Sequence, residues 1–255
     1  LAMPGAVLEP IDLFRVGVTL KTGIGLARHL DSVAVDISAL AMIRDRIIDD
    51  QELLQVIEHS CDDEGCVLST ASEDLDQIRS RLRGARSRIV KKLESLLSSL
   101  PDRFVVPDAS VTIRDGRFVI PVRREGKGKV GGIVHDESQT GSTLYIEPPI
   151  AIEATNHLRE LEREEAREIR RILRMLTDVL GRHQREIEGL FEALVDFDTL
   201  YARAQTAVFW EATPPVINGL APGKFSLRDA RHPLLVESKE GAVIPYDLTL
   251  ENQER

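Results

Sequence analysis

Two long stretches of the chain repeat apolar residues at spacings of three and four, and a short β-like segment separates them. The first series is Leu75, Ile78, Leu82, Ala85, Ile89, Leu93, Leu96 and Leu100. The second is Leu158, Leu161, Ile169, Ile172, Leu176, Val179, His183, Ile187, Leu190, Leu194 and Phe197, with Glu165 as its one charged member. This spacing places each series on one face of a helix, as in a coiled coil. Two matched seams around a short insert predict an antiparallel helix pair with the insert at its far end.

Local signals predict where these helices begin and end. Ser72 is a favourable N-cap, and Pro101 ends the first helix because proline cannot continue it. The second helix is expected to start near Ile150, after two prolines, and Gly181 and Gly189 weaken it and could mark a bend.

The remaining segments predict a helical core. Residues 1–59 carry helical periodicity, with Pro10 in a first turn, Asp36 or Ser38 as the cap of a second helix and Asp50 as the start of a third. Residues 198–212 are expected to continue the second long helix back into the core through Leu200, Ala204 and Val208, with Trp210 buried. From Thr213 onward the sequence predicts loops and short strands, including the segment VIPYDLTL.

The predicted fold class is therefore mainly α with a small β insertion: a helical core, two long antiparallel coiled-coil lever helices and an antiparallel β clamp at their tip. The expected divisions are core residues 1–70, a first lever helix over 71–101, a clamp over 102–149, a second lever helix over 150–197, and a second core part with a linker over 198–255.

Composition excludes several classes of protein. The 255 residues carry a net charge of −9, with 42% hydrophobic and 29% charged residues, which is typical of a folded protein with long exposed helices. No run of 18 apolar residues and no signal peptide are present, so no membrane partner is expected. Cys61 and Cys66 lack the spacing of a zinc site, and sparse cysteine usage suits a reducing cytoplasm.

The insert between the helices predicts a small sheet with reversed charge. Four strands are expected at Val111–Ile113, Phe118–Val122, Gly131–Val134 and Thr143–Ile146, with Asp115-Gly116 as a hairpin turn and Gly126 and Gly128 in the next turn. The segment 114–129 has a net charge of +4 and is expected to be the densest positive group of the chain; its basic residues are Arg114, Arg117, Arg123, Arg124, Lys127 and Lys129. Such residues on turns suit phosphate contacts, although a merely solubilising turn has the same composition.

Other chemistry finds less support in the sequence. No stacking aromatic is expected among the basic residues, because Phe118 and Tyr145 are predicted to pack between sheet and helices, which argues against a single-strand platform. His135, Asp136 and Glu137 have no nearby His or Cys to complete a metal or catalytic site, so HDESQTG is predicted to be a polar connection. The sequence contains no P-loop, nucleophile elbow or HExxH motif, and no catalytic residue is predicted.

The segment IRDGRFVIPVRREGKGKVGGIVHDESQTGSTLYIEP, followed by NHLRELEREEAREI, resembles the clamp and second lever helix of bacterial MutS homologues. It is most similar to the second bacterial paralogue, which lacks the mismatch-reading domain and ends in an Smr nuclease domain. The segment CDDEGCVLSTASEDLDQIRSRLR resembles the entry into the first lever helix, and DARHPLLV and VIPYDLTL resemble the segment before the ATPase domain. The resemblance covers about residues 36–250.

The resemblance implies a nucleic-acid-binding lever and clamp within a larger, ATP-driven, homodimeric parent protein. ATP and Mg²⁺ would bind to the parent's ATPase domain, and the parent would carry an endonuclease domain; the missing initiator Met fits a fragment without either. Residues around Pro245 and Asp247 resemble the stretch near the adenine pocket, although without a P-loop they are not expected to hold ATP. The resemblance implies that the nucleic-acid contacts of the family's clamp are made here by Arg123, Arg124, Lys127 and Lys129, and less directly by Arg114 and Arg117.

Three functions remain open from the sequence. The first is binding of duplex or branched DNA in the suppression of homologous recombination. The second is binding of ribosomal RNA in a ribosome-rescue factor that splits collided ribosomes. The third is self-association through the coiled coil.

Overall fold

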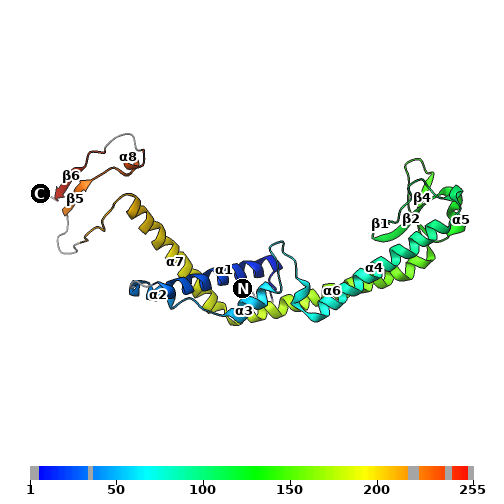
Figure 1. The fold of residues 1–255 in the computed structure, drawn as a ribbon, viewed down its shortest axis with the longest axis horizontal. Helices are drawn as coiled ribbons and strands as arrows, with labels where there is room; N and C mark the ends of the chain where they lie inside the picture. Colours follow the sequence, from blue (N-terminus) through cyan, green and yellow to red (C-terminus); the bar gives the residue numbers. More distant parts are fainter. Residues whose placement is uncertain (1–5, 34–36, 218–223, 239–242, 252–255) are drawn as a thin grey trace.

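The computed structural model describes residues 6–33, 37–217, 224–238 and 243–251, which form an extended, curved molecule (Figure 1). A group of helices, called the body here, lies in the middle. Two long helices, called the shaft, lead from the body to a small sheet, called the tip, which comprises residues 102–148. At the opposite end a two-stranded sheet follows the last long helix. None of the described helices is long and apolar enough to cross a bilayer.

The body is built from helices near the N-terminus and from the parts of the long helices that lie beside them. Its N-terminal elements are α1 (Pro10–Ser32), η1 (Ser38–Leu40), α2 (Ala41–Arg44) and α3 (Gln51–Glu58). Pro10 occupies the first turn of α1, as predicted, and the Asp50 carboxylate caps α3 by accepting from the Leu53 amide at 2.9 Å. Ser38 begins η1, whereas Asp36 lies outside the described residues. Leu13, Leu20, Ile57 and Leu190 are buried at the centre of this body.

The shaft consists of α4 (Glu73–Ser99) and α6 (Pro149–Arg182), which run antiparallel as predicted. Ion pairs across the shaft demonstrate the direction, because the residue number on α6 falls as the number on α4 rises. Arg79 pairs with Glu165, Arg81 with Glu164 and Arg86 with Glu162. At 1.5 Å per residue, α4 extends for about 40 Å.

The Ser72 cap ties the base of α4 to α6. The Ser72 hydroxyl accepts from the Leu75 amide at 3.0 Å and donates to the Glu168 carboxylate at 2.7 Å. Glu168 is 9% exposed and also accepts two hydrogen bonds from Arg171. The hydrogen bonds from Arg171 and Ser72 hold the pKa of Glu168 below its ordinary value, against the effect of burial.

The shaft seam differs from the prediction near the ends of both helices. Leu97 is buried, whereas the predicted Leu96 is only half-buried, because successive steps of four place Ile89, Leu93 and Leu97 in line. On α6 the buried charged residue is Glu168, and Glu165 lies at the flank of the seam. The regular helix is interrupted at His183, close to the predicted bend at Gly181, and α7 (Gln184–Phe209) continues beyond it.

Two apolar cores meet along the shaft. The body core includes Leu75 of α4 and Ile172 and Leu176 of α6. The second core begins at Leu82, continues through Ile89 and Leu93, and extends into the sheet of the tip. Between them lie the polar contacts of Glu168 and of the Arg79–Glu165 pair, so the seam is apolar in two segments rather than along its whole length.

The tip is a four-stranded antiparallel sheet, as predicted. Its strands are β1 (Thr112–Arg114), β2 (Arg117–Arg123), β3 (Ile133–Glu137) and β4 (Thr143–Glu147). Asp115 and Gly116 form the predicted turn, with φ angles of 49° and 71° that place both in the left-handed region. Phe118, Ile120 and Ile146 face the shaft and are buried against it.

The predicted turn at Gly126 and Gly128, which was expected to join the second and third strands, is wrong. The strand order is β1-β2-β4-β3, so β4 separates β2 from β3 and a tight turn cannot join them. The chain instead crosses through η4 (Arg124–Gly126) and the short helix α5 (Lys127–Val130). The predicted polar connection from His135 to Gly141 is likewise shorter, because His135, Asp136 and Glu137 belong to β3.

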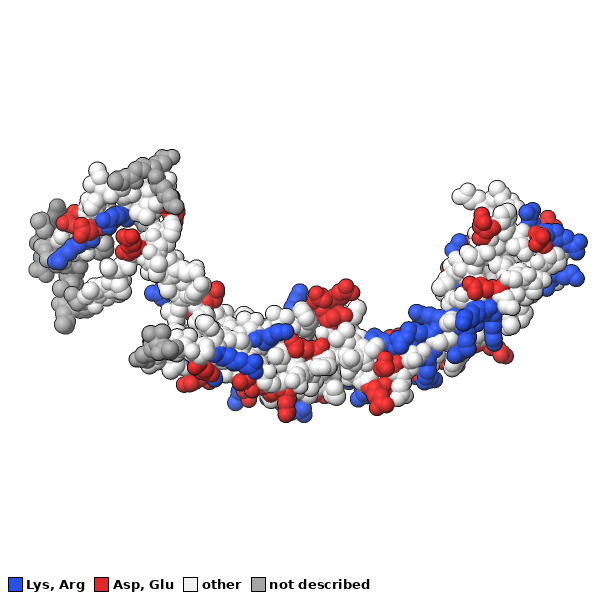
Figure 2. Space-filling view, viewed as in Figure 1, with Lys and Arg blue, Asp and Glu red and all other residues white. Residues whose placement is uncertain are grey.

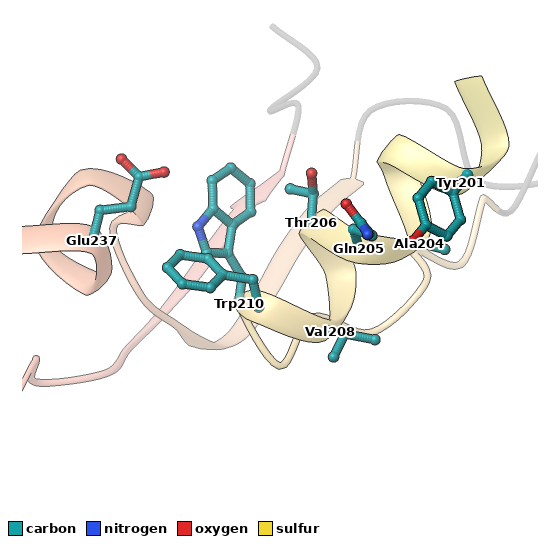
Figure 3. A pocket seen from close by; sticks show the side chains of 8 residues that line it. Tyr201, Ala204, Gln205, Thr206, Val208, Trp210 and Glu237 are labelled. Carbon is teal, nitrogen blue, oxygen red and sulfur yellow. The ribbon is translucent and has the colours of Figure 1, made fainter. Parts of the chain in front are cut away.

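The C-terminal part of α7 does not return into the body. Leu200 is 41% exposed and Val208 is 79% exposed, so the prediction that they pack on the core is wrong. Trp210 is half-buried at the end of α7, where it lines an open pocket together with Tyr201 and Glu237 (Figure 3). Beyond it lie β5 (Lys224–Ala230), α8 (Pro233–Ser238) and β6 (Tyr246–Glu251), with β5 and β6 paired antiparallel.

The seam register generates a first testable expectation. The substitution Leu97→Ala is expected to lower the free energy of unfolding by about 2–5 kcal/mol, because it opens a cavity between α4 and the tip. Leu96→Ala removes the same atoms from a half-buried position and is expected to cost less than half as much. Urea unfolding followed by circular dichroism measures both, and equal losses would contradict the observed register.

The Ser72–Glu168 contact generates a second expectation, on pH dependence. A carboxyl whose pKa is lowered on folding stabilises the protein above its unfolded pKa of about 4.3, and that contribution is lost as pH falls through the folded pKa. Wild type is expected to lose stability between neutral and acidic pH as Glu168 becomes protonated. In the Glu168→Gln variant this loss is therefore expected to be smaller. Thermal unfolding across that pH range measures it, with Glu160→Gln, an exposed position on the same helix, as the control.

Candidate nucleic-acid interface

The structure separates the six predicted basic residues of the tip into four groups by what they contact. Arg114 lies on β1, where its guanidinium is 4.6 Å from the centre of the Tyr145 ring and 3.2 Å from the Asp136 carboxylate. Tyr145 is thus half-buried beneath an arginine rather than packed between the sheet and the helices, and an aromatic ring does lie among the basic residues. Arg114 is partly neutralised by Asp136 but remains accessible.

Arg117 supports the tip from inside. Its guanidinium donates to Glu147 at 3.4 Å and to the Asn156 side-chain oxygen on α6 at 3.0 Å. Glu147 is 1% exposed, and the His135 Nε2–H donates to its other carboxylate oxygen at 2.8 Å. A buried carboxylate requires such partners. Arg117 and His135 therefore stabilise the fold of the tip. Two residues that the sequence suggested for phosphate contact and for a metal or catalytic site thus have structural partners instead.

Gly132 allows this buried contact to form. Its φ of +93° is unfavourable for other residues, and a Cβ there would lie 2.0 Å from the Glu147 carbonyl oxygen. The close approach joins the start of β3 to the end of β4, where Glu147 pairs with Ile133. Backbone conformation and the buried carboxylate are thus linked at one end of the sheet.

Arg123 and Arg124 extend from the sheet margin and are both exposed. Arg123 donates through Nε to the Val105 carbonyl at 3.1 Å. Arg124 donates to the Gly141 carbonyl and to Glu137, each at 2.7 Å. These contacts engage part of each guanidinium and orient the side chain, since a guanidinium has five N–H donors.

Among the described residues, Lys127 and Lys129 are held neither by a hydrogen bond to a carbonyl nor by an ion pair. Both lie on α5 and are exposed, and in the part of the chain that the structure describes neither has a hydrogen-bond or ion-pair partner. The helical crossover presents them at the extremity of the molecule beside Arg123 and Arg124. Four of the six predicted residues thus form a connected basic edge of the tip, with Arg114 at a neighbouring strand and Arg117 inside.

The shaft carries more positive charge than the sequence analysis recognised. Seven basic and no acidic residues lie between Arg79 and Lys92, so the expectation that the tip holds the densest positive group is wrong. Figure 2 shows Lys and Arg side chains gathered over the α4 and α6 pair, between the body and the tip. A sliding count of charge along the sequence identifies this segment.

Pairing reduces that charge unevenly. Arg79, Arg81 and Arg86 pair with glutamates of α6, as described above. The remaining cations of this segment are exposed and have no ion-pair partner among the described residues; they are Arg83, Arg88, Lys91 and Lys92. The shaft therefore has both structural and unengaged cations.

Other chemical sites are weakly supported. Among the described residues, no three His, Cys, Asp or Glu side chains are placed to hold a metal ion. Cys61 is buried, and burial with the neighbouring Asp62 raises the pKa of its thiol to about 11, which makes it a poor nucleophile. Asp247 accepts from the Asp229 amide at 2.9 Å, so its carboxylate caps a contact between β5 and β6.

Comparisons with known proteins relate the chain to one group. No protein-family model matches it. The chain is 44% identical over 222 residues to "Endonuclease MutS2" of Gemmatimonas aurantiaca, an alignment that covers 87% of this chain and 27% of that protein. It is 38% identical to "Endonuclease MutS2" of Geobacillus thermodenitrificans and 36% identical to that of Bacillus velezensis, over 96% of this chain and 31% of each relative. The chain thus spans about three tenths of the length of these relatives.

The buried role of Arg117 is testable by local stability. Arg117→Gln is expected to lower the opening free energy of the β2 and β4 amides by about 2 kcal/mol, because Glu147 loses a charged donor. Arg114→Gln removes the same charge from an exposed pair and is expected to cost less than about 1 kcal/mol. Native-state hydrogen exchange reports both, and equal effects would show that Arg117 has no special structural role.

Proposed function

Since the chain belongs to the MutS2 family over the aligned region, we propose that it forms the lever and clamp by which a larger MutS-type protein holds nucleic acid. The shaft corresponds to the levers, and the tip to the clamp. The proposed ligand is the phosphate backbone of duplex or branched DNA, and the proposed biological role is suppression of homologous recombination.

The observation that carries this proposal is the unengaged charge on α5. Lys127 and Lys129 project from a helical crossover at the end of a shaft of about 40 Å, in a chain whose net charge is −9. Cations without protein partners keep their full charge for a polyanion, and their contacts with phosphates release counterions. Arg123 and Arg124 flank them with partly restrained guanidiniums, whose planar donors suit phosphate oxygens.

The mechanism proposed for these residues is electrostatic positioning. Contacts with phosphate and sugar hold a duplex in place and do not read its sequence. The partner of Tyr145 is Arg114, so this ring is not free to stack on a base, which favours backbone contact over a single-strand platform. Nucleotide binding, the endonuclease activity in the relatives' name and dimerisation are proposed for the parent protein, and none is assigned to these residues.

The proposal predicts the salt dependence of binding. Lys127→Glu with Lys129→Glu is expected to lower the slope of log affinity against log salt by about two units, since each phosphate contact contributes about 0.9. Fluorescence anisotropy with linear duplex DNA across a salt series measures this slope. The matched control reverses Arg28 and Arg203, which are exposed on α1 and α7.

The outcomes separate the candidate functions. A four-way DNA junction bound more tightly than linear duplex supports the recombination role, whereas binding to ribosomes alone supports the ribosomal one. An unchanged slope in the lysine variant refutes the clamp proposal. Light scattering at the same concentrations tests self-association.

A further inference from the structure

The structure sorts the charged run of α6 onto different faces. The segment 159–174 reads RELEREEAREIRRILR, and its opposite charges at three and four residues suggest a helix surface stabilised by its own ion pairs. Instead, Glu162, Glu164 and Glu165 reach across to arginines of α4. Glu168 is buried beneath Arg171 and Ser72. These four glutamates are thus used along the seam and its flanks, whereas Glu160 is exposed beside His157.

Four arginines remain on the outer side of the same helix: Arg163, Arg167, Arg170 and Arg174. Each is exposed, and none has a hydrogen-bond or ion-pair partner within the described part of the chain. Their spacings of four, three and four keep them within about 60° of the helix circumference, in a stripe about 16 Å long. We call this set the arginine stripe.

The stripe is unfavourable for the isolated helix. Arg163 and Arg167, and likewise Arg170 and Arg174, are like charges four residues apart, and such pairs destabilise a helix. Of the glutamates three residues before them, Glu164 is engaged with Arg81 of α4, and Glu160 lies beside His157 of the same helix. An anionic partner that runs along the whole row would relieve this repulsion and so lower the electrostatic free energy of the guanidiniums.

The unengaged cations of α4 do not form a comparable surface. At 100° per residue, Arg83, Arg88, Lys91 and Lys92 are spread over about half of the helix circumference. A rigid polyanion could contact only part of that set at once. The arginine stripe is the arrangement whose linear shape matches a repeated phosphate backbone, and guanidiniums bind phosphate oxygens in a bidentate manner.

We propose that the arginine stripe is a second phosphate-binding surface, along which nucleic acid held by the tip continues over the shaft. The inference rests on the proposed function of the tip and extends it. Along α6, Arg163 lies about 21 Å from Pro149 and Arg174 about 38 Å. At 3.4 Å per base pair, a duplex must extend roughly 6–11 base pairs beyond the tip to cover the stripe.

A length series with charge variants tests this. The stripe variant replaces Arg163, Arg167, Arg170 and Arg174 by Gln. The control variant replaces Arg28, Arg182, Arg185 and Arg203 by Gln, which are equally exposed arginines on α1, α7 and the body end of α6. The salt slope of each 255-residue chain is measured on DNA duplexes of about 10 and about 30 base pairs and on an RNA duplex of the longer length. Circular dichroism verifies that both variants keep their helix content.

The stripe variant is expected to lower the slope by about two to four units on the longer duplex and by less than one on the shorter, while the control variant matches wild type. A similar loss on RNA extends the surface to both nucleic acids, and a loss on DNA alone confines it to DNA. A stripe variant with the wild-type slope on the longer duplex, together with a lower slope in the lysine variant of the tip, overturns this inference and leaves the clamp proposal standing.

Equal losses of slope in the stripe and control variants also overturn the inference, because they would reflect net charge alone. If neither the stripe nor the lysine variant changes the slope, both proposals fail.

Discussion

The structure depends on the antiparallel seam between α4 and α6. Among the described residues, neither helix has another partner in the part of the shaft beyond the body, so there each buries its apolar face against the other and against the tip. Leu82, Ile89 and Leu93 of α4 meet Leu158 and Leu161 of α6 in a single core, which continues into the sheet through Ile120 and Ile146. The sheet is too small to be stable alone, because four short strands need a second apolar layer. The seam therefore provides the surface on which the tip folds.

Electrostatic pairing follows from the same geometry. Once the helices are antiparallel and in register, Glu162, Glu164 and Glu165 lie opposite Arg86, Arg81 and Arg79. Exposed pairs of this kind contribute little stability each, but they decide which cations remain available. An arginine of α4 that meets a glutamate is structural, and an arginine on the outer side of α6 is not. The cations proposed here to contact nucleic acid are thus those that the pairing leaves without a carboxylate partner.

Sequence periodicity was sufficient for the elements and for much of their arrangement. The two seams predicted the antiparallel pair, Ser72 and Pro101 predicted the ends of α4, and Asp115-Gly116 predicted the turn between β1 and β2. These features rest on local chemistry that each residue carries by itself. The same holds for the Asp50 cap and for Pro10 in the first turn of α1.

What the sequence did not predict depends on contacts between distant residues. The crossover at α5 follows from the insertion of β4 between β2 and β3, and strand order leaves no mark on the 124–130 segment itself. Leu96 and Leu97 are equally apolar and follow Leu93 by three and four residues, so the spacing alone does not decide which is buried; in the structure Leu97 packs in the core shared with the tip. Trp210 is an aromatic residue that the described chain leaves half-exposed. Of the six basic residues, Arg117 could not be recognised as structural until Glu147 was seen to be buried beside it.

The division of the seam into two cores determines which parts of the molecule move together. One core joins the tip to the shaft. In addition, Arg117 of the sheet donates to Asn156 of α6, and Arg159 of α6 donates to the Asp115 carbonyl of the tip. The tip and the neighbouring part of α6 therefore form one unit. Between this core and the body core lie Glu168, Ser72 and the Arg79–Glu165 pair, which are polar contacts. Bending there separates fewer apolar atoms than bending within either core, so a movement of the shaft relative to the body would carry the lysines of the tip as a unit with the outer segment of the shaft.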